Sequence, residues 1–506
     1  MSLSVANGLP DRAYSVAQAR ELERLAAVSF DLPGSLLMER AGRAAANFVL
    51  ARYPLAQRIA IVCGTGNNGG DGYVLARLLS ESRRDVIVFA PDDLGPTRDE
   101  ALDAASKWRN AGGYLTHFDG QLPAVDLVVD ALFGIGISRA PQAAHAVMIA
   151  AMNAQSAPIL ALDVPSGIDA DSGAAAGAAV RAHSTLSFIA IKRGLYTGRA
   201  PAHVGSLHLA ELDLPMVLFA CVPPALRVLQ SKDLEGWLPP RERDAHKGNF
   251  GHVLIVGGDE GMGGAVRLAA EAAARVGAGL ISVATRAANA QAITSARPEL
   301  MARAVAGPGE LASMLNRASV VVIGPGLGQS AWAHSLLEEV TARGLPTVLD
   351  ADALNLLAQV ACVLPEQVVI TPHPGEAARL LDCSTPEIQS NRFDAAERLM
   401  DFFQATVVLK GAGTIVRDRA QGASICVSAN PGMATGGTGD VLAGCIGGLL
   451  AQGLSAPDAA RAAVMLHALA GEAAAADGER GMLAGDLLPH LRRLANPRRN
   501  GANRAD

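Results

Sequence analysis

Short apolar runs alternate with longer amphipathic stretches through the first half of the chain. The apolar runs predict strands at residues 58–63, 85–90, 127–131, 159–163 and 184–191. The amphipathic stretches predict helices at residues 15–27, 34–53 and 72–82. Because strands that alternate with helices form parallel sheets with helices on both faces, we expect this half to fold as an α/β domain.

The alternation stops around residues 215–240 and then resumes. Two proline pairs, at 223–224 and 239–240, bracket a stretch without clear periodicity. The second series predicts strands at 253–256, 280–284, 320–323, 347–349, 368–370 and 406–409, and helices at 264–276, 441–450 and 459–476. We therefore predict an N-terminal domain at 1–220, a linker region at 221–240, a second α/β domain at 241–495 and a polar tail at 496–506.

Composition narrows the class of protein. A chain of 506 residues is too long for one hydrophobic core, and its net charge of −6 argues against nucleic acid as the main partner. Six cysteines without CxxC spacing indicate neither a zinc site nor a disulfide framework, so we expect a reducing cytoplasm. The N-terminus lacks a signal-peptide pattern, and the longest apolar run, 441–451, is far shorter than the roughly 20 residues of a spanning helix. No membrane partner is expected.

A glycine-rich turn follows the first predicted strand and reads Gly64-Thr-Gly-Asn-Asn-Gly-Gly-Asp71. Glycines let the backbone approach a phosphate, and the N-terminus of the next helix supplies free N–H groups. A dinucleotide oxidoreductase would need an acidic residue at the end of the second strand, whereas Asp85 stands at its beginning. The turn therefore favours another ligand, and a tight strand-to-helix turn without any ligand is the alternative.

Two later strands of this domain end in aspartates, Asp130 and Asp163. The carboxyl ends of parallel strands line the ligand crevice of an open α/β sheet, so both could converge with Asn68 and Ser166. A set of oxygen ligands with low total charge suits K⁺ better than zinc. Either aspartate taken alone could instead be a helix cap or a turn former.

These segments resemble the NAD(P)HX epimerase family over roughly residues 12–215. The resemblance rests on Asn67-Asn-Gly-Gly-Asp71, Asp130-Ala-Leu-Phe-Gly134, Asp163-Val-Pro-Ser-Gly-Ile168 and Phe188-Ile-Ala-Ile-Lys-Arg-Gly194. It implies a Rossmann-like domain that interconverts the R and S hydrates of NADH and NADPH (NADHX and NADPHX). It also implies K⁺ ligands and substrate contacts. The implied ligands are Asn68, Asp130 and Ser166, and the implied contacts are Asn67, Asn68, Gly69, Gly70, Asp71, Gly134, Ile135, Gly136, Ile137, Ser138, Arg139, Ala140 and Asp163.

Epimerisation at C6 of the hydrate requires movement of a proton and of water at that carbon, and Asp163 is our candidate acid/base. Similar domains also occur in a non-catalytic mRNA-decapping scaffold, so the fold alone would not establish activity. Retention of both strand-end aspartates favours the enzyme. Arg193 departs from the family pattern, in which proline often stands beside the lysine.

The second domain carries Thr435-Gly-Gly-Thr-Gly-Asp440 directly before a predicted helix. The glycines allow the backbone to wrap an anion, and the helix N-terminus directs N–H groups at developing phosphate charge. Asp440, on the first turn, could then deprotonate a hydroxyl beside that phosphate, as phosphoryl transfer to a hydroxyl requires. Asp440 as a plain first-turn acid is the alternative, and the motif is not a P-loop, because no Gly-Lys-Ser/Thr follows.

Three further turns follow strands of this domain. Lys410-Gly-Ala-Gly-Thr414 offers a lysine and backbone N–H groups for nucleotide phosphates, although it could be an ordinary solvated turn. Thr371-Pro-His-Pro-Gly-Glu376 holds His373 in an extended turn between two prolines, where it could be a ligand contact or a structural histidine. Gly324-Pro-Gly-Leu-Gly328 is another glycine-rich strand end.

Together these motifs resemble the ribokinase-like fold and, more closely, the ADP-dependent NAD(P)HX dehydratase family, over about residues 230–492. The string from 430 to 444, the segment from 371 to 376 and Asp350-Ala-Asp-Ala-Leu-Asn355 are the most specific parts. The resemblance implies two sets of contacts. The implied ADP contacts are Lys410, Gly411, Ala412, Gly413, Thr414 and Gly439. The implied contacts of the S hydrate are Ala265, Gly326, Gly328, His373 and Asp440.

The combined prediction is a bifunctional repair enzyme that uses K⁺ in the first domain and Mg²⁺ with ADP in the second, and that assembles as a homo-oligomer. A small-molecule kinase fused to an inactive sensor domain is the main rival, because the anion hole and Asp440 suit it equally. A nucleotide-binding or scaffold protein without turnover is the other. The segment from 371 to 376 and the fused first domain favour repair.

Overall fold

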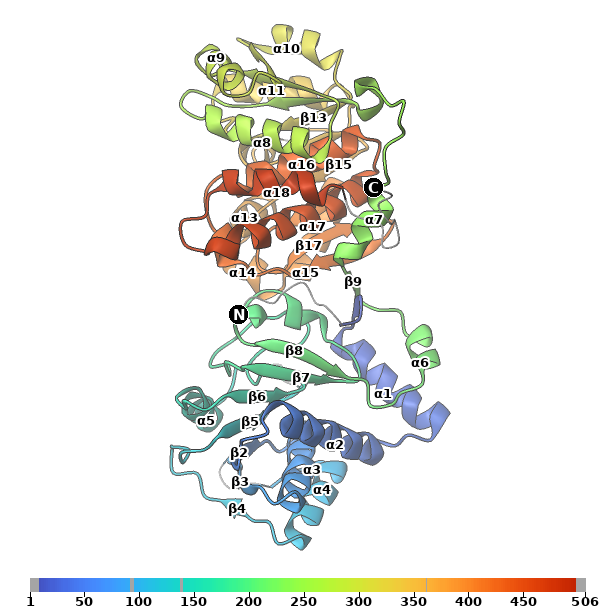
Figure 1. Cartoon of the computed structure of the whole chain (residues 1–506), viewed down its shortest axis with the longest axis vertical. Helices are drawn as coiled ribbons and strands as arrows, with labels where there is room; N and C mark the ends of the chain where they lie inside the picture. The colour runs from blue at the N-terminus through green and yellow to red at the C-terminus, as the bar shows by residue number, and fades with distance from the viewer. Residues whose placement is uncertain (1–8, 92–94, 137–139, 361, 497–506) are drawn as a thin grey trace, which may run out of the picture. The chain divides into compact units, whose positions relative to one another are not determined.

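The computed structural model describes residues 9–91, 95–136, 140–360 and 362–496. The chain divides into two compact units, with the border between Arg227 and Val228. Each unit holds its own mainly parallel sheet with helices on both faces (Figure 1). Within the described ranges, no helix is long and apolar enough to cross a membrane.

The first unit is built on a seven-stranded parallel sheet in the order β4-β3-β2-β5-β6-β7-β8. Its strands are β2 (Arg58–Cys63), β3 (Asp85–Phe89), β4 (Leu115–Thr116), β5 (Leu127–Ala131), β6 (Ile159–Leu162), β7 (Ser184–Phe188) and β8 (Ser206–Ala210). The central strands β2, β5 and β6 are mainly apolar because both faces of the sheet are covered. In β2, for example, Ile59 and Ile61 belong to one core, and Ala60 and Val62 belong to the other.

Helices cover the two faces of this sheet unequally. One core is closed by α1 (Val16–Phe30), α2 (Gly34–Arg52), α3 (Asn67–Glu81), α4 (Asp99–Asn110) and α6 (Met216–Cys221). The opposite core is closed by α5 (Ala143–Asn153). A short strand, β1 (Arg12–Ala13), pairs antiparallel with the start of β9 (Leu226–Val228).

The sheet of the second unit has the order β18-β17-β16-β15-β14-β13-β10-β11-β12. It is parallel from β12 to β16 and antiparallel from β16 to β18. Its strands are β10 (His252–Val256), β11 (Leu280–Thr285), β12 (Met301–Ala304), β13 (Val320–Ile323), β14 (Thr347–Leu349), β15 (Val368–Ile370), β16 (Thr406–Leu409), β17 (Thr414–Asp418) and β18 (Gly422–Cys426). The turn at residues 410–413 therefore joins two antiparallel neighbours.

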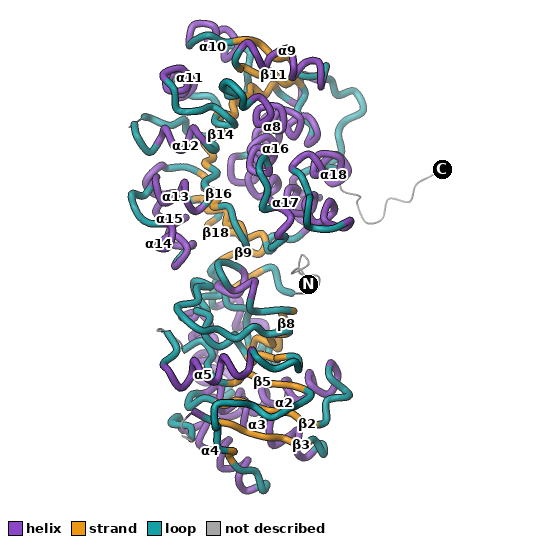
Figure 2. Tube along the Cα trace, turned by 90° about the vertical axis from the view of Figure 1, so that its left-hand side faces the viewer, coloured by secondary structure: helices purple, strands orange, loops and turns teal. Residues whose placement is uncertain are grey.

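Helices also cover both faces of the second sheet. One face packs against α7 (Leu234–Trp237), α8 (Gly263–Val276), α16 (Thr438–Ala451), α17 (Ala456–Ala474) and α18 (Leu487–Leu494). On the other side of the strands, Figure 2 shows helices that include α11 (Ala331–Thr341), α12 (Asp352–Leu357), α13 (Pro374–Leu380) and α15 (Arg392–Phe403). The same unit contains α9 (Ala287–Ala296), α10 (Pro308–Leu315) and α14 (Thr385–Ser390).

Several element boundaries differ from those that the sequence predicts. Helix α3 begins at Asn67 rather than at residue 72, so Asn67 and Asn68 lie in its first turn. Strand β7 ends at Phe188 rather than at residue 191, because Ile189 adopts a left-handed φ of 67° that ends the extended run. The stretch from 215 to 240, which has no clear periodicity, contains α6, β9 and α7.

Candidate functional sites

In the first unit, glycines place the start of α3 against the end of the neighbouring strand. A Cβ on Gly64 would lie 1.9 Å from the carbonyl oxygen of Leu132, and one on Gly69 would lie 1.9 Å from that of Gly64. No larger residue fits at either position without moving the backbone. Asn68 is thereby buried at the first turn of α3.

The buried Asn68 belongs to an oxygen cluster at the ends of the strands. Its Nδ2 donates to the carbonyl of Phe133 at 2.9 Å, while its buried Oδ1 has no hydrogen-bond partner among the described residues. Asp130 is completely buried and accepts from the backbone N–H and the hydroxyl of Ser166 at 2.8 and 2.6 Å. Burial raises the pKa of Asp130 to about 6, although the hydrogen bonds from Ser166 lower it. Three predicted ligands therefore lie in one buried cluster.

Asp163 follows β6 and adopts a left-handed φ of 63°. Its Oδ1 forms a buried ion pair with Lys192 and accepts from the backbone N–H of Phe188 at 3.2 Å. Lys192 is held in turn by the carbonyl of Phe188 at 2.9 Å and the hydroxyl of Ser187 at 3.2 Å. These contacts fix the orientation of Asp163, whose strained backbone is typical of functional sites.

Gly134 brings the oxygen cluster and Asp163 together. A Cβ on Gly134 would lie 3.3 Å from Cβ of Asn68 and 3.4 Å from Oδ2 of Asp163, so it borders both. Ile135 and Gly136 continue as a turn, and Ala140 is exposed. The remaining predicted contacts of this loop, Ile137, Ser138 and Arg139, lie outside the described residues.

Two further carboxyl groups face Asp163. Burial raises the pKa of Asp71 well above its ordinary value, and the negative charges of Asp163 and Glu23 raise it further. The pKa of Glu23, on α1, is raised by the same causes, burial first and then Asp163. Three carboxyl groups and Lys192 therefore share one electrostatic environment.

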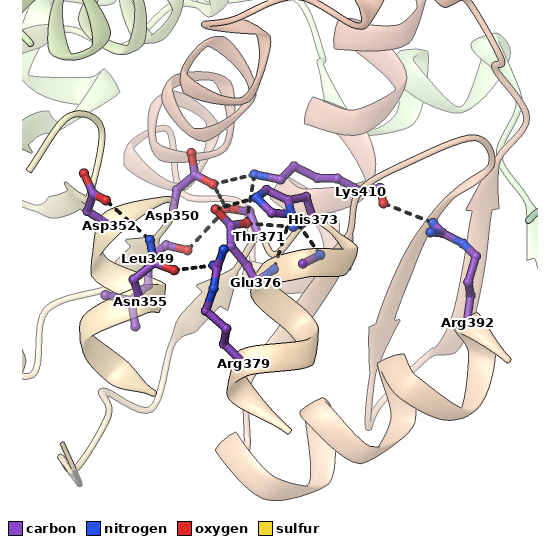
Figure 3. A network of polar contacts seen from close by, with 11 residues as sticks. Leu349, Asp350, Asp352, Asn355, Thr371, His373, Glu376, Arg379, Arg392 and Lys410 are labelled. Carbon is purple, nitrogen blue, oxygen red and sulfur yellow. Dashed lines mark hydrogen bonds and ion pairs between the residues drawn. The ribbon is translucent and has the colours of Figure 1, made fainter. Parts of the chain in front are cut away.

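In the second unit, Lys410 lies at the centre of a polar network (Figure 3). Its Nζ is 2.7 Å from Oδ1 of Asp350 and 3.7 Å from Oε2 of Glu376. The hydroxyl of Thr371 donates to the same Oδ1 of Asp350 at 2.7 Å. The ends of β14, β15 and β16 bring these residues together, because neighbouring parallel strands end at one edge of the sheet.

Asp440 lies on the first turn of α16, as the sequence predicts. Gly437 precedes this turn with a φ of 94°, which an L side chain rarely adopts. Burial and then the charge of Asp350 raise the pKa of Asp440 to about 7, although Lys410 lowers it. A carboxyl with this pKa can exchange a proton near neutral pH.

Two cavities meet beside Asp440. One, of about 380 Å³, is lined by Asp350, His373, Glu376 and Asp440. The other, of about 410 Å³, is lined mainly by apolar side chains and backbone, and it includes Cys426, Met433, Leu442, Val464 and His467. Lys410, Gly411, Thr438 and Gly439 line both cavities. A molecule bound in one cavity can therefore reach a molecule bound in the other at these shared residues.

His373 has a structural role as well as a place in the 380 Å³ cavity. It is the N-cap of α13, where its Nδ1 accepts from the backbone N–H groups of Gly375 and Glu376 at 3.0 and 3.3 Å. Nδ1 is therefore unprotonated, and Nε2, 3.3 Å from Oε1 of Glu376, carries the hydrogen. Burial and then the charge of Lys410 lower the pKa of His373, so a neutral donor faces the cavity.

The other predicted contacts of the second unit form a separate group. Gly326 lies beside Ala265, since a Cβ on Gly326 would be 3.2 Å from Cβ of Ala265. The backbone N–H of Gly328 donates to Asp352 at 2.9 Å, and the charge of Asp352 raises the pKa of Asp440. Asp352 therefore contacts this group and also acts electrostatically on Asp440.

Comparison with known proteins identifies the family. Family models described as YjeF-related protein N-terminus and as NAD(P)H-hydrate dehydratase match residues 34–194 and 253–493. A Coxiella burnetii protein named bifunctional NAD(P)H-hydrate repair enzyme Nnr is 50% identical over 486 residues, which cover 96% of this chain and 99% of that protein. The chain belongs to the family of bifunctional NAD(P)H-hydrate repair enzymes. An Escherichia coli repair enzyme of the same name is 44% identical, covering 97% of this chain and 95% of that protein.

Membership of the repair-enzyme family confirms the family prediction and, at that level, the prediction of a bifunctional enzyme. A solved ribokinase-like superfamily protein from Enterococcus faecalis is 33% identical with a TM-score of 0.50, covering 54% of this chain and 95% of that protein. The predicted order of a Rossmann-like parallel-sheet domain and a ribokinase-like domain is thereby confirmed.

Sequence reasoning missed several residues of the repair-enzyme sites. Asp350 and Glu376 belong to quoted motifs but received no role. Asp350 directly follows β14, and a carboxylate at a strand end is a signal that the sequence shows. His467, on α17, lines the 410 Å³ cavity, and its Nε2 is 2.9 Å from the carbonyl of Thr438. Burial lowers the pKa of His467 to about 4. Neither His467 nor Glu23 stands in a motif, so only the fold brings them to the sites.

Proposed function

We propose that this protein returns hydrated NADH and NADPH to their active forms in two steps. The first unit interconverts the R and S hydrates, and the second unit dehydrates the S form with ADP, giving NAD(P)H, AMP and phosphate. The observation that carries the proposal is the pair of cavities that meet at Lys410 and Gly439 beside Asp440. Such an arrangement holds a phosphoryl donor and a hydroxyl acceptor side by side.

The two cavities suit different ligands. The 410 Å³ cavity has apolar walls for an adenosine group and ends at the 410–414 loop and Gly439, which are placed to bind the phosphates of ADP. The 380 Å³ cavity contains Asp440 and His373, and we place the reduced nicotinamide hydrate there. We keep Ala265, Gly326 and Gly328 as contacts for the remainder of this substrate.

The dehydration then follows from the position of Asp440. Its carboxylate removes the proton from the C6 hydroxyl of the hydrate, and the oxygen attacks the β-phosphorus of ADP, releasing AMP. The N–H groups at the start of α16 and the ammonium of Lys410 stabilise the charge that develops on the phosphoryl group. The lone pair of the ring nitrogen expels the new phosphate ester, and loss of a proton from C5 completes the double bond. NAD(P)H and phosphate are the products.

The site also suits a magnesium ion bound together with the nucleotide. Oδ1 of Asp350 accepts from Thr371 and Lys410, while its Oδ2 faces Gly439, 3.8 Å from where a Cβ would stand. Mg²⁺ is typically held by one or two carboxylates together with substrate phosphates, and Asp350 would supply one. When bound, the ion would offset the negative charge of the phosphates.

In the first unit, the oxygen cluster fits K⁺. Oδ1 of Asn68 is a buried acceptor that no residue in the described part of the chain binds, and Asp130 supplies a buried carboxylate beside the hydroxyl of Ser166. These are the oxygen ligands that a large monovalent cation requires. When bound, K⁺ would offset the charge of Asp130 and fix the loop that contains Gly134.

Asp163 is the proposed acid/base of epimerisation. Lys192 and the backbone of Phe188 hold its Oδ1, which leaves Oδ2 on the side of Gly134. Asp71, whose pKa burial raises, can remain protonated nearby and donate a proton to the C6 hydroxyl as it leaves. Water that returns to the opposite face of C6 gives up a proton to the carboxylate of Asp163, which yields the other epimer, and transfer of that proton to Asp71 restores both groups.

The proposal is tested by incubating the purified protein with a mixture of R and S NADHX and with ADP. Absorbance at the reduced-nicotinamide band measures recovered NADH. Recovery of both epimers supports both activities, whereas recovery of the S form alone would show that the first unit is idle. Absence of recovery with either ADP or ATP would overturn the proposal.

A further inference from the structure

Arg392 lies directly against the loop at residues 410–413. It is the first residue of α15, and its side chain is almost completely buried. Its Nη2 donates to the carbonyls of Leu409 and Lys410 at 3.2 Å each and to that of Gly413 at 3.4 Å. Its Nη1 donates to Oε1 of Gln389 at 3.1 Å. One guanidinium therefore binds backbone carbonyls on both sides of the loop, and Figure 3 shows its contact with Lys410.

These contacts decide which way the peptide groups of the loop point. In a trans peptide the C=O and the following N–H point in opposite directions. Because Arg392 holds the carbonyl of Lys410, the N–H of Gly411 points away from the guanidinium, and Gly411 lines both cavities. A backbone N–H directed in this way can donate to a phosphate oxygen.

The packing around Gly411 supports the same conclusion. Gly411 has a φ of 138°, and a Cβ there would lie 2.9 and 3.1 Å from Nη1 and Nη2 of Arg392. The loop therefore approaches the guanidinium as closely as a glycine allows. The backbone N–H of Lys410 donates to the carbonyl of Pro372 at 2.9 Å, so the loop is fixed at its start by a second contact.

We propose that Arg392 is a positioning residue for the phosphate-binding loop of the dehydratase site. It holds the carbonyls of Leu409, Lys410 and Gly413 away from the nucleotide and thereby directs the N–H of Gly411 towards the phosphates of ADP. Its buried positive charge adds to the attraction for those phosphates. The inference rests on the proposed use of ADP at this site.

Replacement of Arg392 by lysine tests the proposal, because an ammonium on a shorter side chain cannot bind three separated carbonyls. Calorimetric titration with ADP and with adenosine separates the phosphate contribution from that of the nucleoside. We expect R392K to weaken ADP binding at least about tenfold and adenosine binding less than about twofold. The KM for ADP should rise by the same factor, with a smaller change in kcat. A general loss of structure would weaken the binding of ADP and of adenosine alike, and that result would overturn the proposal. Unchanged ADP binding in a folded variant would overturn it as well.

Gln389→Ala is a second variant that avoids the core. Gln389 is exposed, so its loss spares the fold while it removes one contact that orients the guanidinium. We expect a weaker effect of the same kind, about twofold to threefold on ADP and none on adenosine. Equal loss of affinity for the two ligands would count against the proposal.

Arg461→Lys is the matched control. Arg461 is another fully buried arginine of this unit, but it binds the carboxylate of Asp418 and the hydroxyl of Ser424 instead of the loop. R461K should lower the thermal midpoint and leave the ratio of ADP to adenosine affinity unchanged. A wild-type protein that binds no ADP would refute the proposed function, whereas wild-type binding that R392K and Gln389→Ala retain in full would refute the positioning role alone.

Discussion

Asp440 receives opposing influences from its neighbours. Burial and the carboxylate of Asp350 favour its protonated form, whereas Lys410 favours its ionised form. The result is a pKa of about 7, which is near the optimum for a general base in a neutral solution. Asp440 is therefore the proposed general base, and its ionisation also lowers the stability of the folded protein.

The first prediction concerns pH. Because Asp440 must be ionised to accept a proton, kcat for dehydration should fall about tenfold for each pH unit below about 7 and level off above it. Replacement by asparagine should lower kcat by about 10²–10⁴-fold and remove this dependence. Initial rates of NADH recovery from S-NADHX between pH 5.5 and 9 would measure both effects, and a wild-type profile that is flat across this range would contradict the assigned role.

The second prediction concerns stability. The folded state binds the Asp440 proton more tightly than the unfolded chain does, so ionisation of this group lowers the free energy of unfolding as pH rises from about 4 through about 7. Asp440→Asn removes that cost and should raise the free energy of unfolding above pH 7 by about 2 kcal/mol. Urea denaturation at pH 8 and at pH 5 checks the sign, because the gain should largely disappear at the lower pH.

The third prediction concerns K⁺. Asn68→Ala removes the proposed K⁺ ligand Oδ1, which no described residue binds, so the K⁺ concentration for half-maximal epimerisation should rise about tenfold. The exchange rate between R and S NADHX, measured in K⁺ with Na⁺ as the replacement salt, reports this value. Asn110→Ala, at the exposed end of α4, is the control. If the epimerisation rate of the wild-type protein does not depend on K⁺, the assignment of Asn68, Asp130 and Ser166 as K⁺ ligands is wrong.

Helix α16 is the element that aims the anion-binding turn. Gly444 packs against α8, where a Cβ would lie 2.0 Å from the carbonyl oxygen of Ala269, and Gly448 packs one turn later against Ala273. The two helices therefore approach each other through backbone contacts. This close packing fixes the N-terminus of α16, and Asp440 with it.

The fourth prediction follows from that packing. Gly444→Ala forces α16 and α8 apart and should lower the free energy of unfolding by about 1–3 kcal/mol. The dehydration rate should fall as well, because the first turn of α16 moves relative to Lys410. Gly309→Ala, at a helical glycine of α10 with open space around it, is the control and should be neutral or slightly stabilising. Chemical denaturation and NADH recovery measure the two effects.

At the scale of the whole molecule, each unit contains its own sheet, its own core and its own candidate site. The fifth prediction is that the two activities separate. Asp440→Asn should slow dehydration by about 10²–10⁴-fold and leave epimerisation intact, while Asp163→Asn should slow epimerisation and leave dehydration of S-NADHX intact. Loss of both activities in either folded variant would contradict separate sites.

Two expectations about the whole molecule stay predictions. The six cysteines are all free thiols, as the expectation of a reducing cytoplasm requires, and cell fractionation would check the compartment. A homo-oligomer is expected, and light scattering of the purified protein would measure its mass.

The sequence by itself determined the fold class, the order of the two domains and the family. Buried strands appear as apolar runs because both faces of a parallel sheet are covered, and β2 is an example. Two glycines can be recognised in the sequence as structurally required. Close packing excludes a side chain at Gly64, and a left-handed φ disfavours one at Gly437. Such local requirements leave a mark in a short stretch of sequence, and so Asp440 could be assigned to the first turn of α16 from the motif alone.

Only the tertiary structure decided which distant residues meet. Asp350 and Lys410 are 60 positions apart, and Arg392 holds a loop that begins 18 positions later. The ends of neighbouring strands bring such residues together, and nothing in the intervening sequence specifies those distances. The pKa of Asp440 depends on burial and on charges from three other segments, and His373 became a helix cap because α13 begins beside it. Contacts and desolvation are properties of the folded chain, and so the sequence could name Asp440 and His373 but not their protonation.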